Sequence, residues 1–487
     1  VDIGEYAYKN LRLYSNFPLV KNKLSMRLNF GSSYHDGYRK NIYRSVSNSG
    51  NRNEQFYRLK LKLQTSKKFN FLITALYSKL DNGYDSWAPD NNTQFNTYTD
   101  DIGKDSQMTK GISMRTNLLL SDNLKILSIS SITKTDLTHS YDSDWANDIY
   151  WLENHNFDPT VYGYSYKFFD KNVKKRNNIT QEIRTSFWKG EHRFISGVYF
   201  KNLTEIDTAS GYLYGGEANQ ASSEFNFDAY AAYFKGKVHL NDKIVADANI
   251  RFEKNIYDYS GVSQYNFYDF FELPSVDFEI DTDMIGFKSS LLYSPDNRFN
   301  YFVSFSRGFK SGGVNQHPYL SDLNRPYFPE YIRNFEFGFK YFRNDNTIMA
   351  TLFNSIRDNQ QVSISSQQDK NDPSSFFFYT ANAGVGNNTG LEFESSFKLL
   401  PNLSFKTNFG ILKTYIEKFS FMSYSGPEFG GDRKAAMSPE LMGSITINYQ
   451  IENFNIIANS TYKDEYYFSD SHNEKSKPYS LSNITMI

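Results

Sequence analysis

The chain has 487 residues and a formal net charge of −1, so it lacks the basic field that nucleic-acid binding requires. It contains no cysteine, which excludes disulfides, thiolate metal ligands and a cysteine nucleophile. Aromatic residues make up 17% of the chain although the mean hydropathy is −0.60, which suits apolar residues arranged as one thin layer.

The beginning of the chain, Val1 to Tyr6, has neither the charged segment nor the apolar segment of a signal peptide. No run of about 18 apolar residues follows, so the sequence offers no transmembrane helix. If the protein is exported, we expect its natural N-terminus to lie upstream of Val1.

Strict alternation of apolar and polar residues is the strongest pattern along the chain. It appears in turn at 24–30, 57–64, 244–253, 335–341 and 445–449. A helix would spread these apolar residues around its circumference, whereas a strand places them all on one face. Each segment is therefore predicted to be a strand with one apolar face.

Short links rich in Asn, Asp, Gly and Pro separate pairs of predicted strands, as tight turns require. They lie at 21–23, 121–123, 189–191, 241–242, 295–297, 344–346, 401–402 and 452–453. Long polar and aromatic stretches separate the pairs, at 38–52, 83–107, 141–177, 205–223, 259–280, 310–329, 359–379 and 419–436. Short turns at one end and long loops at the other are typical of a bacterial transmembrane barrel with its long loops outside the cell.

Counting in this way gives about twenty strands. Soluble sheets rarely exceed about ten strands, and a propeller would show a fixed repeat, which is not visible. The predicted fold class is all-β, a transmembrane antiparallel β-barrel with long extracellular loops and short periplasmic turns.

Several segments resemble the barrel of TonB-dependent outer-membrane receptors, and the likeness extends over most of the chain. Segment 16–19, Asn-Phe-Pro-Leu, resembles the end of that family's second barrel strand, and segment 305–313 its S-R-G-F-K-S-G-G element. Segments 382–384 and 389–394 resemble the family's "NAG" and "G-hydrophobic-E" element. Segment 438–440, Ser-Pro-Glu, resembles the start of a strand near its C-terminus.

The family barrel has 22 strands, and the order of elements agrees with that number. Assigning Leu11–Phe17 to the second strand makes Tyr479–Ile487 the twentieth. The resemblance then implies that residues 1–487 are a barrel domain. It also implies that an N-terminal plug with its TonB box, and the last two strands, lie outside this chain.

No catalytic motif accompanies this pattern: the sequence has no P-loop lysine motif, no H-E-x-x-H and no G-x-S-x-G. We therefore expect no enzyme, no cofactor and no resident metal.

The resemblance implies active import of a ferric siderophore or similar chelate through the outer membrane of a Gram-negative bacterium, with iron present only in the cargo. The expected partners are the TonB–ExbB–ExbD complex and outer-membrane lipid, and the expected state is a monomer. Receptors for cobalamin, haem or oligosaccharide share this architecture, and a passive porin-like channel is a further alternative.

Two long stretches are crowded with aromatic residues, which offer a large and rigid contact area to a ligand. Segment 140–145 also resembles a Y-D-x-D-W element of siderophore receptors, whose carboxylates would orient a loop or bind calcium. The same aromatic residues also fit an interfacial girdle, and both roles stay open. The candidate ligand-binding residues are Tyr84, Trp87, Tyr141, Asp142, Asp144, Trp145, Trp151, Arg307, Lys310 and His317.

Overall fold

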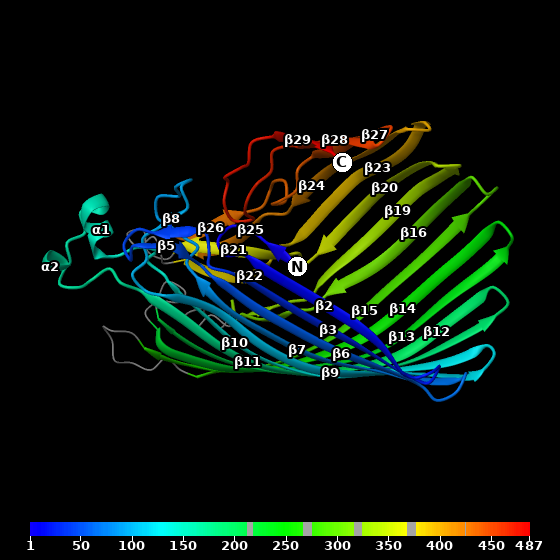
Figure 1. Ribbon diagram of the computed structural model, residues 1–487, viewed down its shortest axis with the longest axis horizontal. Coiled ribbons are helices and arrows are strands. Elements are labelled where there is room, and N and C mark those ends of the chain that lie inside the picture. The colour runs from blue at the N-terminus through cyan, green and yellow to red at the C-terminus, as the bar shows by residue number, and fades with distance from the viewer. Residues whose placement is uncertain (212–217, 266–274, 316–323, 368–375, 424) are drawn as a thin grey trace.

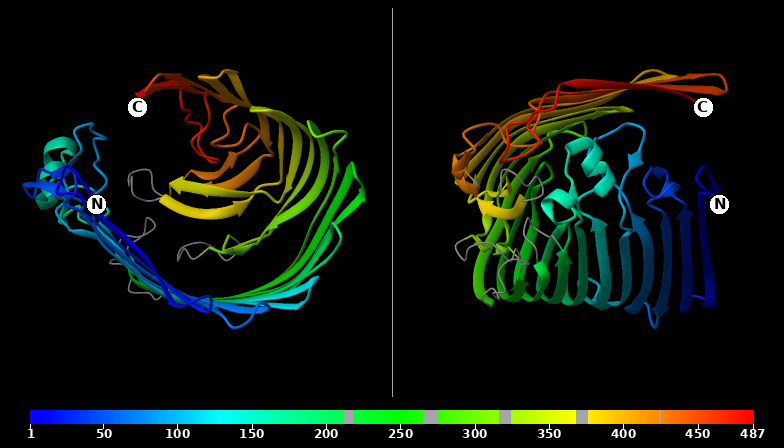
Figure 2. Two further views of the ribbon diagram at one scale, coloured as in Figure 1. Left: turned by 45° about the vertical axis from the view of Figure 1, so that its right-hand side comes forward. Right: turned by 90° about the vertical axis from the view of Figure 1, so that its left-hand side faces the viewer.

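A single antiparallel sheet of 20 strands dominates the computed structural model. The structure describes residues 1–211, 218–265, 275–315, 324–367, 376–423 and 425–487. Each strand of the sheet is hydrogen-bonded to the next one along the chain, from β1 at one edge to β29 at the other. The sheet curves around an interior space (Figures 1 and 2), and no hydrogen bonds join β1 to β29 among the described residues.

The strands of this sheet connect in the simplest possible way, as a meander. In chain order they are β1 (Asp2–Ile3), β2 (Lys9–Val20), β3 (Leu24–His35), β6 (Arg52–Gln64), β7 (Phe69–Tyr84), β9 (Gly103–Ser121), β10 (Leu124–Asp142), β11 (Phe169–Lys189), β12 (His192–Gly211), β13 (Ala218–Asn241), β14 (Ile244–Tyr265), β15 (Val276–Tyr293), β16 (Phe299–Lys310), β19 (Glu330–Arg343), β20 (Asn346–Asp358), β23 (Val385–Leu400), β24 (Leu403–Ile416), β27 (Leu441–Ile451), β28 (Phe454–Lys463) and β29 (Tyr479–Met486).

The remaining elements lie in the long connections. They are β4 (Arg39–Asn41), β5 (Val46–Ser49), β8 (Asn96–Thr97), α1 (Asp148–His155), α2 (Pro159–Tyr162), β17 (Gly313–Val314), β18 (Pro326–Tyr327), β21 (Gln361–Gln367), β22 (Phe376–Asn382), β25 (Phe419–Ser423) and β26 (Gly426–Gly430). No helix among the described residues is long and apolar enough to cross a membrane.

The predicted fold class and strand order are confirmed. The segment expected to be the second strand is β2, and the segment expected to be the twentieth is β29. All eight predicted short turns connect consecutive strands. We call this side of the sheet the turn end and the opposite side, where the long connections gather, the loop end (Figure 1).

Strand alternation gives the sheet an interior face and an outward face. Glu330 of β19 faces the interior, because its carboxylate accepts a hydrogen bond of 2.8 Å from the backbone N–H of Gln361, in a hairpin that lies inside the curve (Figure 2). Phe335 and Phe337 lie on the opposite face of β19 and are 51% and 48% exposed. An exposed apolar face on one side and polar groups on the other is the arrangement that a membrane-spanning sheet requires.

The long connections contain more regular structure than the sequence predicts. Strands β12 and β13 extend into the stretch 205–223, which was expected to be a loop. We call the band of outward-facing apolar side chains around the sheet the apolar belt. Beyond it both faces of a strand are polar, so the alternation that marks a strand disappears although the backbone pairing continues. Stretch 359–379 contains β21 and part of β22.

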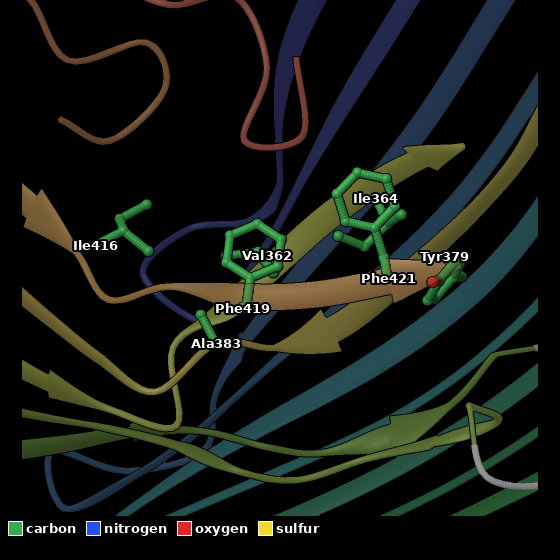
Figure 3. Close-up of a cluster of buried hydrophobic side chains, with 7 residues drawn as sticks. All are labelled: Val362, Ile364, Tyr379, Ala383, Ile416, Phe419 and Phe421. Atoms are coloured by element: carbon green, nitrogen blue, oxygen red, sulfur yellow. The ribbon is translucent and has the colours of Figure 1, made fainter. Parts of the chain in front are cut away.

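The main cluster of buried apolar side chains lies in these connections and not in the wall of the sheet. The hairpins β21–β22 and β25–β26 pack together inside the curve of the sheet (Figures 2 and 3). Ile364 is 0% exposed, and Val362, Phe419 and Phe421 surround it with at most 7% exposed. The two hairpins therefore hold each other in place within the interior.

Candidate ligand-binding site at the loop end

Four of the residues predicted to bind a ligand meet at the loop end, although they come from two separate connections. The rings of Trp87 and Trp145 are stacked with centroids 5.9 Å apart and an interplanar angle of 25°. The Trp87 indole N–H donates to the Tyr84 hydroxyl at 3.0 Å, and the Tyr84 and Tyr141 rings are 6.0 Å apart. We call Tyr84, Trp87, Tyr141 and Trp145 the aromatic platform.

The aromatic platform leaves a large apolar area open to solvent. Trp87 is 52% exposed and Trp145 is 40% exposed. By strand alternation Tyr84 and Tyr141 lie on the interior face, opposite to the face that carries Tyr57. An interfacial girdle would lie on the outward face, so the two tyrosines lie on the face opposite to it.

A buried polar network fixes the connection that carries Trp87. The Asp85 carboxylate is 6% exposed and accepts hydrogen bonds from Asn41 at 3.2 Å, Thr97 at 2.8 Å and Thr99 at 3.1 Å. Asn41 also donates to the Thr99 carbonyl at 2.9 Å. Because Asn41 belongs to β4 and Thr97 to β8, the network ties two long connections together directly beside Trp87.

Asp142 and Asp144 hold the connection that carries Trp145. Asp142 accepts from the backbone N–H groups of Asp100 at 3.0 Å and Trp145 at 3.2 Å. Asp144 accepts from the backbone N–H of Phe168 at 2.8 Å, and both aspartates are 4% exposed. They therefore fix the loop backbone, the first of the two roles that the sequence allowed, and both side chains are buried.

Burial perturbs the ionisation of this pair, which lies at the loop end beyond the apolar belt. Desolvation, reinforced by the charge of Asp144, raises the pKa of Asp142 from its usual 3.8 to about 8. Desolvation also raises the pKa of Asp144, while the backbone N–H of Phe168 acts in the opposite direction. The loop therefore carries a proton whose loss depends on pH.

Trp151 belongs to a second aromatic group around α1. Its indole N–H donates to Asp144 at 3.3 Å, and its ring lies 4.9 Å from those of His155 and Tyr166. Asn147 caps α1 by accepting from the Tyr150 N–H at 3.0 Å. The contacts of Trp151 thus support the loop and do not extend the aromatic platform.

Two further candidates, Arg307 and Lys310, do not join the platform. Arg307 lies on the outward face with Phe305, and its guanidinium stacks over the Tyr331 ring, 3.9 Å from the centroid. Lys310 lies on the interior side at the end of β16 and is exposed. His317 lies outside the described residues.

Sequence reasoning missed several residues of this site. His139 lies 4.7 Å from the Tyr84 ring, and strand alternation with Tyr141 could have placed it there. Arg307 is two residues from Phe305 on the same strand, so alternation could also have placed Arg307 on the outward face. The partnership of Asp85 with Asn41 has no signal in the sequence, since the two residues are 44 positions apart.

The described residues contain no group of three or more His, Asp or Glu side chains that could hold a metal ion. What the site offers is therefore ring surface and a few polar atoms on a backbone fixed by buried hydrogen bonds. Such a surface suits a large ligand with flat, apolar or aromatic parts.

Comparisons with known proteins are informative about the family and the fold. The protein-family model described as "TonB dependent receptor-like, beta-barrel" matches residues 75–486 of this chain. None of the curated proteins compared with this chain matches its sequence. The ferric yersiniabactin uptake receptor FyuA from Yersinia pestis is 14% identical with a TM-score of 0.79, over 99% of this chain and 71% of that chain.

Two further solved structures are similar to the chain. The siderophore receptor PiuA from Acinetobacter baumannii is 13% identical with a TM-score of 0.71, over 99% of this chain and 74% of that one. The copper transporter OprC is 10% identical with a TM-score of 0.72, over 99% and 70%. At these identities the likeness to solved structures shows the fold alone. The family match, however, covers more than half of the chain, so the chain belongs to the TonB-dependent receptor β-barrel family, a family of outer-membrane receptors and not of enzymes.

Proposed function

We propose that this protein imports a ferric siderophore or similar metal chelate across the outer membrane, and that the aromatic platform makes the first contact with it. The observation that carries this proposal is the stacked and exposed pair Trp87 and Trp145 at the loop end. Rigid aromatic rings bind flat organic ligands at a low entropic cost, because few torsions have to be frozen. Two solved structures of the same fold are by name a ferric yersiniabactin uptake receptor and a siderophore receptor.

One further feature supports import over passive diffusion. The hairpins β21–β22 and β25–β26 occupy part of the interior (Figure 2), whereas a general porin keeps an open aqueous channel. We also propose that a plug domain, acted on by the TonB–ExbB–ExbD complex, supplies the directed step. Because no bond of the cargo is broken, this function needs no catalytic residue.

The test uses the full-length protein in a strain from which its gene has been deleted. Growth on single iron sources, together with uptake of iron-labelled chelates, should identify at least one chelate whose uptake depends on the gene. Equal uptake with and without the gene on every chelate would contradict the siderophore proposal. A panel extended to cobalamin, haem and oligosaccharides would then assign the cargo.

The role of the platform is tested by Trp87→Ala combined with Trp145→Ala. A contact residue of this kind contributes about 2 kcal/mol or more when truncated, so in the double variant chelate binding should weaken by at least about thirtyfold. Trp188→Ala is the matched control, because Trp188 lies at the turn end of β11. Unchanged binding in the double variant, with the barrel correctly assembled, would show that the platform is not the ligand site.

A further inference from the structure

An unusual pair of lysines lies on the outward face. Lys110 of β9 and Lys134 of β10 are direct partners across the two strands, and both are exposed. Like charges directly opposite each other destabilise a sheet. An anion bound between them would offset this repulsion by Coulomb attraction. Among the described residues, one ion pair lies on the outward face of β9 and β10, and it joins Lys104 to Asp81 at 3.2 Å.

The two lysines lie at the border of the apolar belt. The next outward-facing pair toward the turn end is Ile112 and Ile132, which are 52% and 56% exposed. On the neighbouring strand β7, Tyr77 is the direct partner of Lys110. Tyrosine is enriched at the boundary between membrane and water. The lysines therefore occupy the level at which lipid headgroups begin.

The lengths of β9 and β10 independently place Lys110 and Lys134 at the level where lipid headgroups begin. Lys134 lies about ten residues from the turn at the start of β10, and Lys110 lies about ten residues from the end of β9. A transmembrane strand crosses the hydrocarbon layer in roughly 9 to 11 residues. Both strands have 19 residues, so their remaining parts extend past the membrane at the loop end.

Two more lysines lie on the same face, one step further toward the loop end. Lys79 of β7 pairs with Met108, and Lys175 of β11 pairs with Asp136. Asp136 is the one acidic residue between them, so this part of the face has a clear excess of positive charge. We call Lys79, Lys110, Lys134 and Lys175 the basic border.

We propose that the basic border is a binding site for the phosphate groups of a lipid in the outer leaflet. The acyl chains would lie against the apolar belt beneath, and the phosphates would lie between the ammonium groups of Lys110 and Lys134. Lysine side chains can extend from a strand to the headgroup layer while their alkyl stems stay on apolar surface. Anionic headgroups attract such lysines at short range. The proposal rests on the family and the fold, and it is independent of the cargo.

The test measures lipid bound to the full-length protein by native mass spectrometry in detergent, with diphosphorylated lipid A as the probe. The double variant Lys110→Gln with Lys134→Gln should bind it at least about tenfold more weakly. Lys67→Gln with Lys68→Gln removes the same charge in the turn after β6, at the opposite end of the sheet, and should bind as the wild type does. Lys134→Glu, which places a carboxylate opposite Lys110, should also lose binding while the barrel remains folded.

Three results would overturn the proposal. The first is equal binding of the probe by the double variant and its turn-end control. The second is that a dephosphorylated lipid with the same acyl chains binds as tightly as the diphosphorylated one. The third is displacement of the lipid by millimolar inorganic phosphate, which would indicate a site for free anions. Resistance of the folded barrel to sodium dodecyl sulfate at room temperature checks assembly of every variant.

Discussion

The most informative single substitution is Asn41→Ala, because Asn41 connects two loops beside the aromatic platform. Its side chain is 0% exposed and donates to the Thr99 carbonyl at 2.9 Å and to Asp85 at 3.2 Å. It also accepts from the backbone N–H of Arg44 at 2.8 Å. Alanine removes all of these hydrogen bonds and introduces no new contact.

The size of the effect follows from the groups that are left without a partner. Arg44 is only half-buried, so water can replace the lost acceptor of its N–H. The Thr99 carbonyl, on a residue that is 4% exposed, loses its donor at a cost of about 2 kcal/mol. Local opening of the loops should then become about thirtyfold more frequent. The wall of the sheet should keep its stability, because none of its ladder hydrogen bonds involves this side chain.

Hydrogen–deuterium exchange measured on segments 39–49 and 96–102 tests this reasoning. Both segments should exchange about thirtyfold faster in Asn41→Ala, and the fluorescence of Trp87 should shift as its stacking on Trp145 loosens. Asn53→Ala is the control, since Asn53 is exposed on neighbouring β6 and no described residue is hydrogen-bonded to its side chain. Exchange as slow as in the wild type would refute the view that Asn41 holds the two loops together.

Further predictions concern the same loops. Because the pKa of Asp142 is raised from 3.8 to about 8, the folded loop holds this proton more tightly than the unfolded loop. Its stabilising contribution is therefore complete below the unfolded value and is lost as the pH rises through about 8. The Trp145 amide, which donates to Asp142, should exchange faster over this window after correction for its intrinsic rate, and a flat profile would contradict the ionisation change. Gly37→Ala should distort the hairpin β4–β5, because Gly37 has φ of +100° and a Cβ would lie 2.0 Å from the Ser49 carbonyl oxygen. Gly163→Ala, with φ of +78° and no atom within 4 Å, should change loop proteolysis much less, and equal sensitivity of the two variants would count against the steric argument.

The sequence alone determined the wall of the barrel. Alternation from Tyr57 to Gln64 defines β6 because a strand needs only its own residues to separate an apolar face from a polar one. The short turns are similarly local, since Asn, Asp and Gly adopt the required backbone conformations by themselves. In a meander each strand pairs with its neighbour in sequence, so strand order followed directly from these two patterns.

Only the tertiary structure decided the site. Trp87 and Trp145 are stacked because two connections converge at the loop end, and no periodic pattern relates residues in separate loops. Asp142 and Asp144 are sequence candidates for a ligand, but folding directs their carboxylates to backbone N–H groups. The partnership of Asn41 with Asp85 depends on the same convergence. A strand's face is determined by local alternation, whereas the position of a loop depends on long-range contacts that form only when the whole sheet curves.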